Sequence, residues 1–315
     1  MIDTKLRDKF TGALLGHAIG DAIGELAFTY NSRSQLDSAI NSKKILRYTD
    51  DTAMAIGCAQ SLIEKEGKFD TEHMGTIFMK NYEAEPWRGY ASGPPFIFDR
   101  IKKENISFKK AASELFNNTG SFGNGAAMRI APVALLFHNL IPIKDLVIEA
   151  SQITHSHKLG IDGSVTIAES LGIVIKHDIE NKFSPKELLY HLREKTETEE
   201  FKEKFLSIRK LLDSDVNPDI ASSTLGQSVS ALESVPFAIY SFLKNSDSFK
   251  DCLYSSTLNE GDCDTLGAMA CSLSGAYLSY HAIPGEWLEK LENRDEIEEI
   301  AIKLYELNQK LKQKK

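Results

Sequence analysis

Apolar residues recur at helical spacing along most of the chain, and this pattern predicts an all-α protein. Residues 62–83, 143–153 and 295–313 each place apolar side chains at i, i+3 and i+4, the repeat of an amphipathic helix. Alternating strands bounded by turns are hard to find, and no linker or solenoid-length repeat divides the chain. We therefore expect one compact domain of roughly a dozen helices over residues 1–315, with a frayed Lys-rich end near 308–315.

Two segments are built of small residues. In "GALLGHAIGDAIG" (12–24) a glycine recurs at every fourth position, so the glycines share one stripe of a helix. Each glycine costs about 1 kcal/mol relative to alanine inside a helix, and close approach of another helix would offset that cost. "TLGAMACSLSGAYLS" (265–279) has the same character. We expect two central helices that pack backbone to backbone.

Two acid-rich stretches, "YTDDTAMAIG" (48–57) and "EGDCDTLGAMA" (260–270), each precede a run of small apolar residues. Their candidate side chains are all Asp or Thr: Thr49, Asp50, Asp51, Asp262, Asp264 and Thr265. Asp and Thr satisfy free N–H groups at a helix start and suit the positive end of the helix dipole. Capping alone is therefore one explanation for each stretch.

The alternative is that the two acid-rich stretches meet and share a metal. At about 5 Å and an effective dielectric of about 20, one like-charge pair costs roughly 3 kcal/mol. Helix dipoles return only about 0.3–1 kcal/mol per charge, so a cation would be required. Asp and Thr oxygens without His or Cys neighbours favour a hard ion, Mg²⁺, with Mn²⁺ able to substitute. Four carboxylates are enough for two ions.

A glycine-rich stretch, "TGSFGNGAAMRIAPVALL" (119–136), predicts a place for phosphate. Its glycines, Ser121 and Asn124 form a turn before a helix that we expect to begin near Ala126, and free N–H groups at such a start bind anions. Phe116 and Phe122 flank the turn and could stack on a base, although core packing is the commoner fate of phenylalanine. An ordinary glycine-rich loop would explain the stretch as well.

Two histidines stand two residues apart in "ITHSHKLGIDGS" (153–164). A zinc pair of His155 and His157 would need a third soft ligand, and the sequence offers none nearby. We expect His155 to form hydrogen bonds at the edge of the pocket instead.

Composition and charge narrow the class of protein. Apolar residues make up 42% and charged residues 26%, as in globular proteins. The net charge of −8 and a pI near 5.6 argue against a duplex-binding surface, so no nucleic acid is expected as a partner. The first ten residues lack a signal-peptide core, no apolar run is long enough to span a bilayer, and the four cysteines lack zinc or disulfide spacing. We expect a cytoplasmic monomer.

Five stretches, in this order, resemble the ADP-ribosylglycohydrolase family: "GDAIG", "YTDDTAMA", "GSFGNGAAMRIAPVAL", "THSHKLG" and "GDCDTLGAMA". The resemblance implies an all-α fold with a centre of two Mg²⁺ ions, and it covers most of the chain. "RGYASG" (88–93) and "ALESVPFAIYSFL" (231–243) look closer to the serine-directed ADP-ribosylhydrolase 3 branch than to the arginine-directed enzymes.

The resemblance also implies roles for individual residues. It places metal ligation on the six Asp and Thr side chains named above, and the candidate catalytic residues are Glu25, Asp50 and Asp51. It places ADP-ribose contacts on Gly89, Tyr90, Phe116, Ser121, Phe122, Gly123, Asn124, His155 and Leu159. In the serine-directed branch a mobile glutamate stands seven residues after the GDxxG aspartate. Here that position is Phe28, and Glu25 is the nearby carboxylate. Either Glu25 is redirected into the site, or an insertion shifts the register, or the usual acid is missing.

The function that the resemblance implies is Mg²⁺-dependent hydrolysis that frees ADP-ribose from modified protein side chains. Serine-linked ADP-ribose is the expected substrate, with O-acetyl-ADP-ribose and poly(ADP-ribose) as further substrates. The partners would be ADP-ribosylated proteins or peptides, without a membrane. An arginine-directed ADP-ribosylhydrolase, a non-catalytic ADP-ribose-binding relative and a nucleotide phosphohydrolase are the alternatives.

Overall fold

The structure of the chain is a computed structural model that describes residues 4–181, 183–214 and 218–314. Over these residues it contains nineteen α-helices, one 3₁₀ helix (η1) and two isolated β-bridges, and no β-strand. The prediction of an all-α protein is confirmed. In chain order, the elements are α1 (Thr4–Ala27), α2 (Arg33–Ser42), α3 (Asp50–Glu64), α4 (Thr71–Ala84), α5 (Gly93–Glu104), α6 (Phe108–Ser113), α7 (Leu115–Asn118), α8 (Gly125–Met128), α9 (Ala131–Phe137), α10 (Lys144–Ser151), α11 (Lys158–Val174), α12 (Pro185–Lys195), α13 (Glu199–Asp213), α14 (Pro218–Leu225), α15 (Ala231–Lys244), α16 (Phe249–Thr257), α17 (Cys263–Leu278), η1 (Tyr280–Ala282), α18 (Gly285–Leu288) and α19 (Arg294–Gln313).

The described residues hold more helices than the dozen expected, and the shortest ones account for part of the difference. α7, α8 and α18 have four residues each. A helix of one turn presents no repeat of apolar positions, so periodicity cannot reveal it.

Helices α1 and α17 pack antiparallel with their backbones in contact, as the glycine stripe predicted. A Cβ atom on Gly12 would lie 2.3 Å from the carbonyl oxygen of Gly275, and one on Gly20 would lie 2.1 Å from that of Gly267. At the other end of the stripe, a Cβ on Gly24 would lie 2.3 Å from the carbonyl oxygen of Cys263. Real Cβ atoms do not approach so closely, so only glycine permits this packing.

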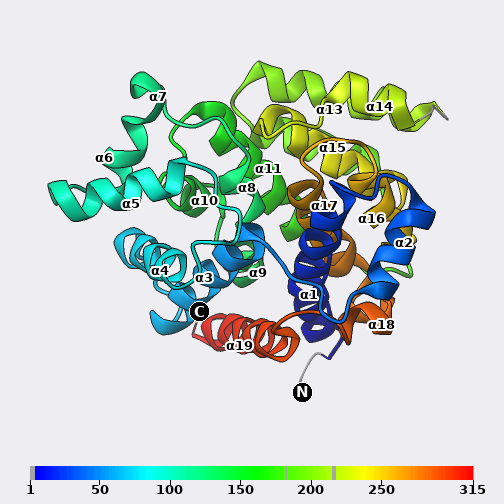
Figure 1. Ribbon diagram of the computed structural model, residues 1–315, viewed down its shortest axis with the longest axis horizontal. Helices are drawn as coiled ribbons and strands as arrows, with labels where there is room; N and C mark the ends of the chain where they lie inside the picture. The colour runs from blue at the N-terminus through cyan, green and yellow to red at the C-terminus, as the bar shows by residue number, and fades with distance from the viewer. Residues whose placement is uncertain (1–3, 182, 215–217, 315) are drawn as a thin grey trace.

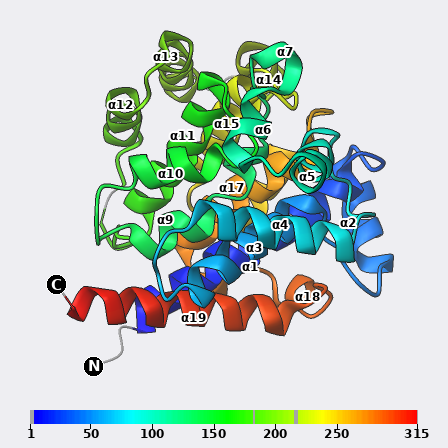
Figure 2. The ribbon, with the colours of Figure 1, turned by 90° about the vertical axis from the view of Figure 1, so that its left-hand side faces the viewer.

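The remaining helices surround this central pair. Figure 1 shows α13 and α14 along one edge of the molecule and α19 along the opposite edge. In Figure 2, turned by 90°, α19 again lies directly beside α1. None of the helices in the described ranges is both long and apolar enough to cross a membrane.

The Lys-rich end is helical rather than frayed as far as Gln313, because α19 is anchored to the core. Asn308 is fully buried, and its Nδ2 donates hydrogen bonds to the carbonyl oxygen of Leu136 at 2.7 Å and to Asn139 Oδ1 at 2.9 Å. Lys315 lies outside the described residues.

Candidate active site

The two acid-rich stretches form the starts of α3 and α17, and the fold brings these starts together. Thr265 Oγ1 donates a hydrogen bond to Asp51 Oδ2 at 3.3 Å, across 214 positions of sequence. Both stretches line one pocket of about 470 Å³, through Asp50, Asp51, Asp262, Asp264 and Thr265. The juxtaposition on which the metal hypothesis depended is therefore present.

Capping does not explain the acid-rich stretches. Thr49 is the N-cap residue of α3 and Asp262 that of α17, yet neither side chain forms a capping hydrogen bond. Thr49 Oγ1 donates instead to Asp21 Oδ1 at 2.8 Å, and Asp262 Oδ2 accepts from Asn124 Nδ2 at 2.6 Å. These side chains serve contacts between elements rather than the ends of their own helices.

Asp21, in the middle of α1, holds the start of α3 in place. This fully buried carboxylate accepts hydrogen bonds from the backbone N–H and the hydroxyl of Thr49, and from the backbone N–H and the hydroxyl of Thr52. Asp21 is not among the site residues expected from the sequence. The available signal was a carboxylate inside a small-residue helix, where burial is costly unless hydrogen bonds compensate for it.

Helix α1 therefore joins the two halves of the site. Asp21 holds the start of α3, and Gly24, three residues later, packs on the backbone of Cys263 and Asp264 at the start of α17. One helix sets the distance between acidic groups that are far apart in the sequence.

Burial makes the carboxyl groups hard to ionise. It raises the pKa of Asp50 to about 7, with the neighbouring charge of Asp21 as the next cause. It raises the pKa of Asp264 to about 8, helped by Asp262, and that of Asp51 well above its usual range, helped by Asp264. The pocket therefore binds either protons or a cation at neutral pH.

The residues present fit a divalent cation. Asp51 Oδ1 is buried and has no hydrogen-bond partner among the described residues. Carboxylate and hydroxyl oxygens are the donors that hard cations prefer. Across the described part of the chain, however, no three His, Cys, Asp or Glu side chains are already gathered into a metal-ligand cluster. The Asp and Thr oxygens thus have the chemistry that a divalent ion requires, and their side chains would have to move closer together to bind it.

One face of the pocket carries aromatic rings. Phe116 is 56% exposed and Phe122 51% exposed, and both line the pocket. Core packing, the commoner fate of phenylalanine, therefore does not apply to either ring. Phe116 also has a positive φ of 51°, a backbone conformation that non-glycine residues rarely adopt outside turns and functional sites.

The glycine loop offers fewer free amides than predicted. The N–H of Gly123 donates to Ser121 Oγ, and that of Asn124 donates to the carbonyl oxygen of Val229. The helix expected near Ala126 begins at Gly125 and ends after one turn, so it has little dipole to attract an anion. The Asn124 side chain is engaged by Asp262 and by Ser234. Asn124 thus connects the loop to the acidic residues.

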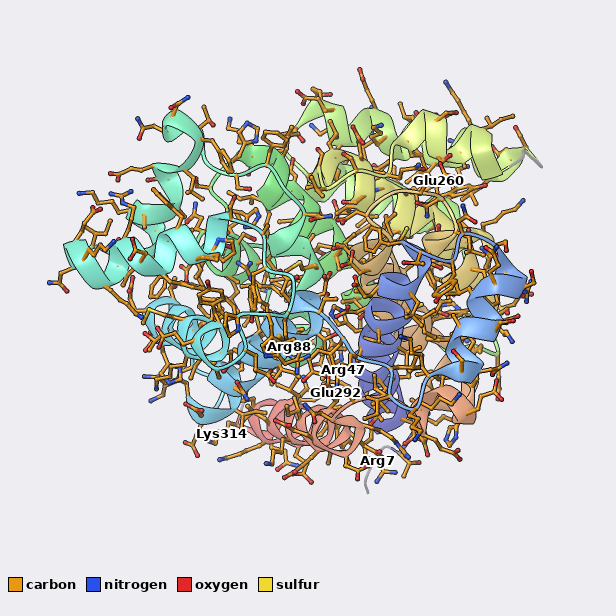
Figure 3. All side chains as sticks on the ribbon, in the orientation of Figure 1. Arg7, Arg47, Arg88, Glu260, Glu292 and Lys314 are labelled. Atoms are coloured by element: carbon orange, nitrogen blue, oxygen red, sulfur yellow. The ribbon has the colours of Figure 1, made fainter. Side chains whose placement is uncertain are left out.

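An ion pair fixes the segment that leads from α4 to the pocket. Figure 3 labels Arg88 and Glu292, whose Nη1 and Oε2 atoms lie 3.0 Å apart. Arg88 Nη1 also donates to the carbonyl oxygen of Tyr48 at 2.9 Å, next to the start of α3. Gly89 follows, and a Cβ on it would lie 3.8 Å from Asp50 Oδ1. The structure therefore places Gly89 in the pocket beside the carboxylates.

The structure places four candidate residues outside the lining of the acidic pocket: Thr49, whose hydroxyl donates to Asp21, and Glu25, Tyr90 and Leu159. Glu25 is exposed and lines a neighbouring hollow of about 560 Å³ together with Lys43, Lys44 and Arg47. Leu159 lines another hollow, of about 630 Å³, with His157 and Glu197. Tyr90 lies behind Gly89 with its hydroxyl buried and, among the described residues, without a hydrogen-bond partner.

The two histidines have different places. His155 is buried, lines the pocket and approaches Thr154 Oγ1 with its Nδ1 at 2.7 Å. His157 is the N-cap residue of α11, and its Nδ1 accepts from the backbone N–H of Leu159. A ring that caps a helix in this way is not a zinc ligand.

Comparison with known proteins agrees with the site. The family model described as ADP-ribosylglycohydrolase matches residues 2–314. The chain is 29% identical to ADP-ribosylhydrolase ARH3 of Bos taurus, over 96% of this chain and 93% of that protein. It is 31% identical to ADP-ribosylhydrolase ARH3 of Danio rerio, over 95% and 90%. A solved structure described as an ADP-ribosylglycohydrolase-related protein complex has a TM-score of 0.71 at 22% identity, covering 97% of this chain and 99% of that one, which shows a shared fold. The chain thus belongs to the ADP-ribosylglycohydrolase family, and it is a hydrolase of the glycosyl bonds of ADP-ribose.

Proposed function

We propose that this hydrolase depends on Mg²⁺ and releases ADP-ribose from serine side chains of modified proteins. One observation carries the proposal. The starts of α3 and α17 meet in one pocket, where buried Asp and Thr oxygens, including the unpartnered Asp51 Oδ1, need a hard cation. Mn²⁺ would be able to replace Mg²⁺, because the donors are all oxygens.

The metal ligands in this proposal are Thr49, Asp50, Asp51, Asp262, Asp264 and Thr265. When bound, the ions would supply the positive charge that holds ribose hydroxyls and the attacking water. Phe116 and Phe122 would cover the adenosine end, and Gly89 would leave room for the ribose beside Asp50. His155 would contact the ribose side, and Ser121 to Asn124 would lie along the diphosphate.

We assign proton transfer to Glu25. As the water oxygen bonds to the anomeric carbon, the bond from that carbon to the seryl oxygen breaks. Glu25 accepts the proton that the water loses, and the seryl oxygen gains one, so the products are ADP-ribose and serine. Glu25 lines the neighbouring hollow here, but Gly24 beside it packs on Asp264. The assignment therefore requires the Glu25 side chain to move from that hollow toward the acidic pocket.

Two features support the choice of serine. The relatives at 28–31% identity over about 95% of the chain are named ADP-ribosylhydrolase ARH3. Two stretches resemble the serine-directed branch: residues 88–93 contribute Gly89 to the pocket lining, and residues 231–243 contact the lining residue Asn124 through Ser234.

The test is a comparison of linkages. The protein is incubated with Mg²⁺ and a serine-ADP-ribosylated peptide, and with an arginine-ADP-ribosylated peptide in parallel, and free ADP-ribose is measured by chromatography. We expect release from the serine peptide only, and its loss with a chelator. Cleavage of the arginine peptide alone would overturn the choice of linkage.

A second candidate is a relative that binds ADP-ribose without efficient turnover. It is favoured by the exposed Phe28 at the position of the family's glutamate and by the absence of Glu25 from the pocket lining. Calorimetry that shows micromolar ADP-ribose binding, together with no cleavage of any linkage, would support it over the hydrolase.

A further inference from the structure

Three side chains form a hydrogen-bonded line from the interior to the pocket. Arg129, directly after α8, is 1% exposed, and its Nη2 donates to Thr154 Oγ1 at 2.7 Å. The same hydroxyl oxygen lies 2.7 Å from His155 Nδ1. Arg129 and Thr154 also border the pocket but have no part in the proposed metal or substrate contacts, so their hydrogen bonds to each other and to His155 call for an explanation.

The first link has a fixed direction. A guanidinium group only donates hydrogen bonds, so Thr154 Oγ1 must accept from Arg129. Arg129 has no carboxylate partner among the described residues, and its other acceptors are the carbonyl oxygens of Gly125 and Ala150. Asp50 interacts with Arg129 through its charge but forms no hydrogen bond with it, so Thr154 is the only side chain in the described residues that accepts from the guanidinium.

The second link takes its direction from the first. Thr154 is 1% exposed, and its hydroxyl has only two hydrogen-bonding neighbours in the described part of the chain, Arg129 and His155. If Nδ1 carried a proton and donated it, the hydroxyl hydrogen would be buried without an acceptor, which is unfavourable. The hydrogen bonds of the Thr154 hydroxyl are all satisfied only when it donates to an unprotonated Nδ1 of His155.

The ring itself is neutral. Burial, and then the charge of Arg129, lower the pKa of His155 to about 3. A neutral imidazole carries one proton, on Nδ1 or on Nε2. With Nδ1 accepting from Thr154, the proton resides on Nε2.

The Nε2 edge of the ring lies against Gly123 and Gly125, two glycines that line the pocket. A Cβ on Gly125 would lie 2.8 Å from His155 Cε1 and 3.1 Å from Nε2, and one on Gly123 would lie 3.6 Å from Nε2. These two glycines therefore leave space for the outer edge of the ring. Within the described residues, no protein group forms a hydrogen bond to Nε2, so this atom is available to a ligand.

We propose that Arg129 and Thr154 are positioning residues that hold His155 in its Nε2–H tautomer, so that the ring offers the pocket a donor and no acceptor. The inference rests on the proposed function for the identity of the ligand, whose ribose and diphosphate oxygens are acceptors. The pocket would then select an oxygen acceptor at this point and disfavour a ligand that presents an N–H or C–H group there.

The tautomer can be measured without substrate. Nitrogen-15 NMR of the histidine rings distinguishes a protonated from an unprotonated Nδ1, and the variant His155→Asn identifies the signals of His155. We expect an unprotonated Nδ1 in the wild-type protein, a mixture of tautomers in Thr154→Val, and the wild-type spectrum in Thr154→Ser. A protonated Nδ1 in the wild type, or an unchanged ring in Thr154→Val, would overturn the inference.

A binding measurement adds the functional consequence. The Kd for ADP-ribose, measured by calorimetry, should rise about tenfold in Thr154→Val and stay near the wild-type value in Thr154→Ser, with the melting temperatures of both variants recorded. An equal loss of affinity in both variants would contradict the inference, because the serine hydroxyl can form the same hydrogen bonds to Arg129 and His155 as the threonine hydroxyl. If the wild type has the predicted tautomer but cleaves no linkage, the proposed function fails while the tautomer assignment stands.

Discussion

At the residue scale, Asp21 shows how an acidic side chain can serve a catalytic pocket without lining it. Its two oxygens accept four hydrogen bonds from Thr49 and Thr52. An amide in its place offers one acceptor oxygen and turns an NH₂ group toward the same donors. The result would be unsatisfied donors at the point where α3 begins.

We therefore predict that Asp21→Asn lowers the free energy of unfolding by about 2–4 kcal/mol and reduces kcat by more than the loss of folded protein explains. Asp162→Asn is the matched control. Asp162 lies on α11, is also buried and is not part of the pocket lining. Its carboxylate accepts hydrogen bonds from the N–H of Glu197 and from the N–H and hydroxyl of Thr198. In urea titration, the Asp162→Asn variant should show a similar loss in the free energy of unfolding, but its kcat per folded molecule should equal that of the wild type. Equal kcat for both variants would show that Asp21 is only structural.

The role of Glu25 can be separated from stability because its side chain is exposed. If Glu25 carries the proton, Glu25→Gln should lower kcat by about 10²–10⁴-fold and leave the melting temperature unchanged. Adding Phe28→Glu to that variant should restore part of the rate, since it returns a carboxylate to the position that the family uses. An active Glu25→Gln enzyme would exclude this residue as the base, and steady-state kinetics on the serine peptide would show it.

At the element scale, the packing of α1 on α17 sets the geometry of the site. The starts of α3 and α17 are held by Asp21 and Gly24, both on α1. Any side chain inserted between α1 and α17 would therefore separate the acidic groups that share an ion in the proposed function.

We predict that Gly20→Ala is strongly destabilising, because the new methyl group would lie 2.1 Å from the carbonyl oxygen of Gly267, a backbone atom that cannot move aside. Overpacking of a core typically lowers the free energy of unfolding by about 1–3 kcal/mol. Because the clash here is with backbone, we expect a loss at or above the upper end of that range. Gly285→Ala, where nothing lies within 4 Å of the new atom, is the control. Thermal unfolding should show a clear fall in Tm for the first variant and no fall for the second.

The elements were predictable where a local pattern carried the information. The helical repeat gave the fold class, and the four-residue glycine spacing gave the backbone contact of α1 with α17. The two acid-rich stretches could be identified, because Asp and Thr cluster there more than caps require. Their meeting could not be derived from spacing, since it depends on α1 lying between them in space.

Other parts of the site could not be predicted either, because they depend on contacts between residues that are distant in the sequence. The loop amides of Gly123 and Asn124 donate to Ser121 and to the distant Val229, contacts that the glycine spacing does not reveal. The support of His155 by Arg129 joins residues 26 positions apart through a threonine. No periodicity or motif records a hydrogen bond of that kind.

At the scale of the whole molecule, charge explains why a cation matters. The chain carries a net charge of −8, and the pocket is lined by Asp50, Asp51, Asp262 and Asp264 against one arginine, Arg129. The diphosphate of ADP-ribose would be repelled by such a pocket in its ionised state. Bound divalent ions would reverse the sign of the local field, so substrate affinity and metal affinity should rise together.

This view predicts a pH dependence of stability with a definite sign. The pKa values of Asp21, Asp50 and Asp264 are raised to about 6, 7 and 8, against about 3.9 in an unfolded chain. Between these limits the folded protein binds more protons than the unfolded one, so metal-free protein loses stability as the pH rises through that range. The pKa values of the buried His17 and His138 are lowered to about 4. These two residues therefore change the stability only below about pH 6.5, where an unfolded histidine ionises.

Mg²⁺ should remove that loss, because metal ligands must be deprotonated and the ion competes with protons for the same oxygens. We predict that the rise in Tm caused by millimolar Mg²⁺, relative to chelator, grows as the pH increases from about 7 to about 8.5. Asp264→Ala should abolish most of the rise, since it removes a proposed ligand, whereas Asp162→Asn should keep it because its carboxylate lies outside the pocket lining. Differential scanning fluorimetry of the three proteins across this pH range measures the effect. A Mg²⁺ response that is flat with pH, or that survives intact in Asp264→Ala, would mean that the carboxylates of α3 and α17 meet without sharing an ion.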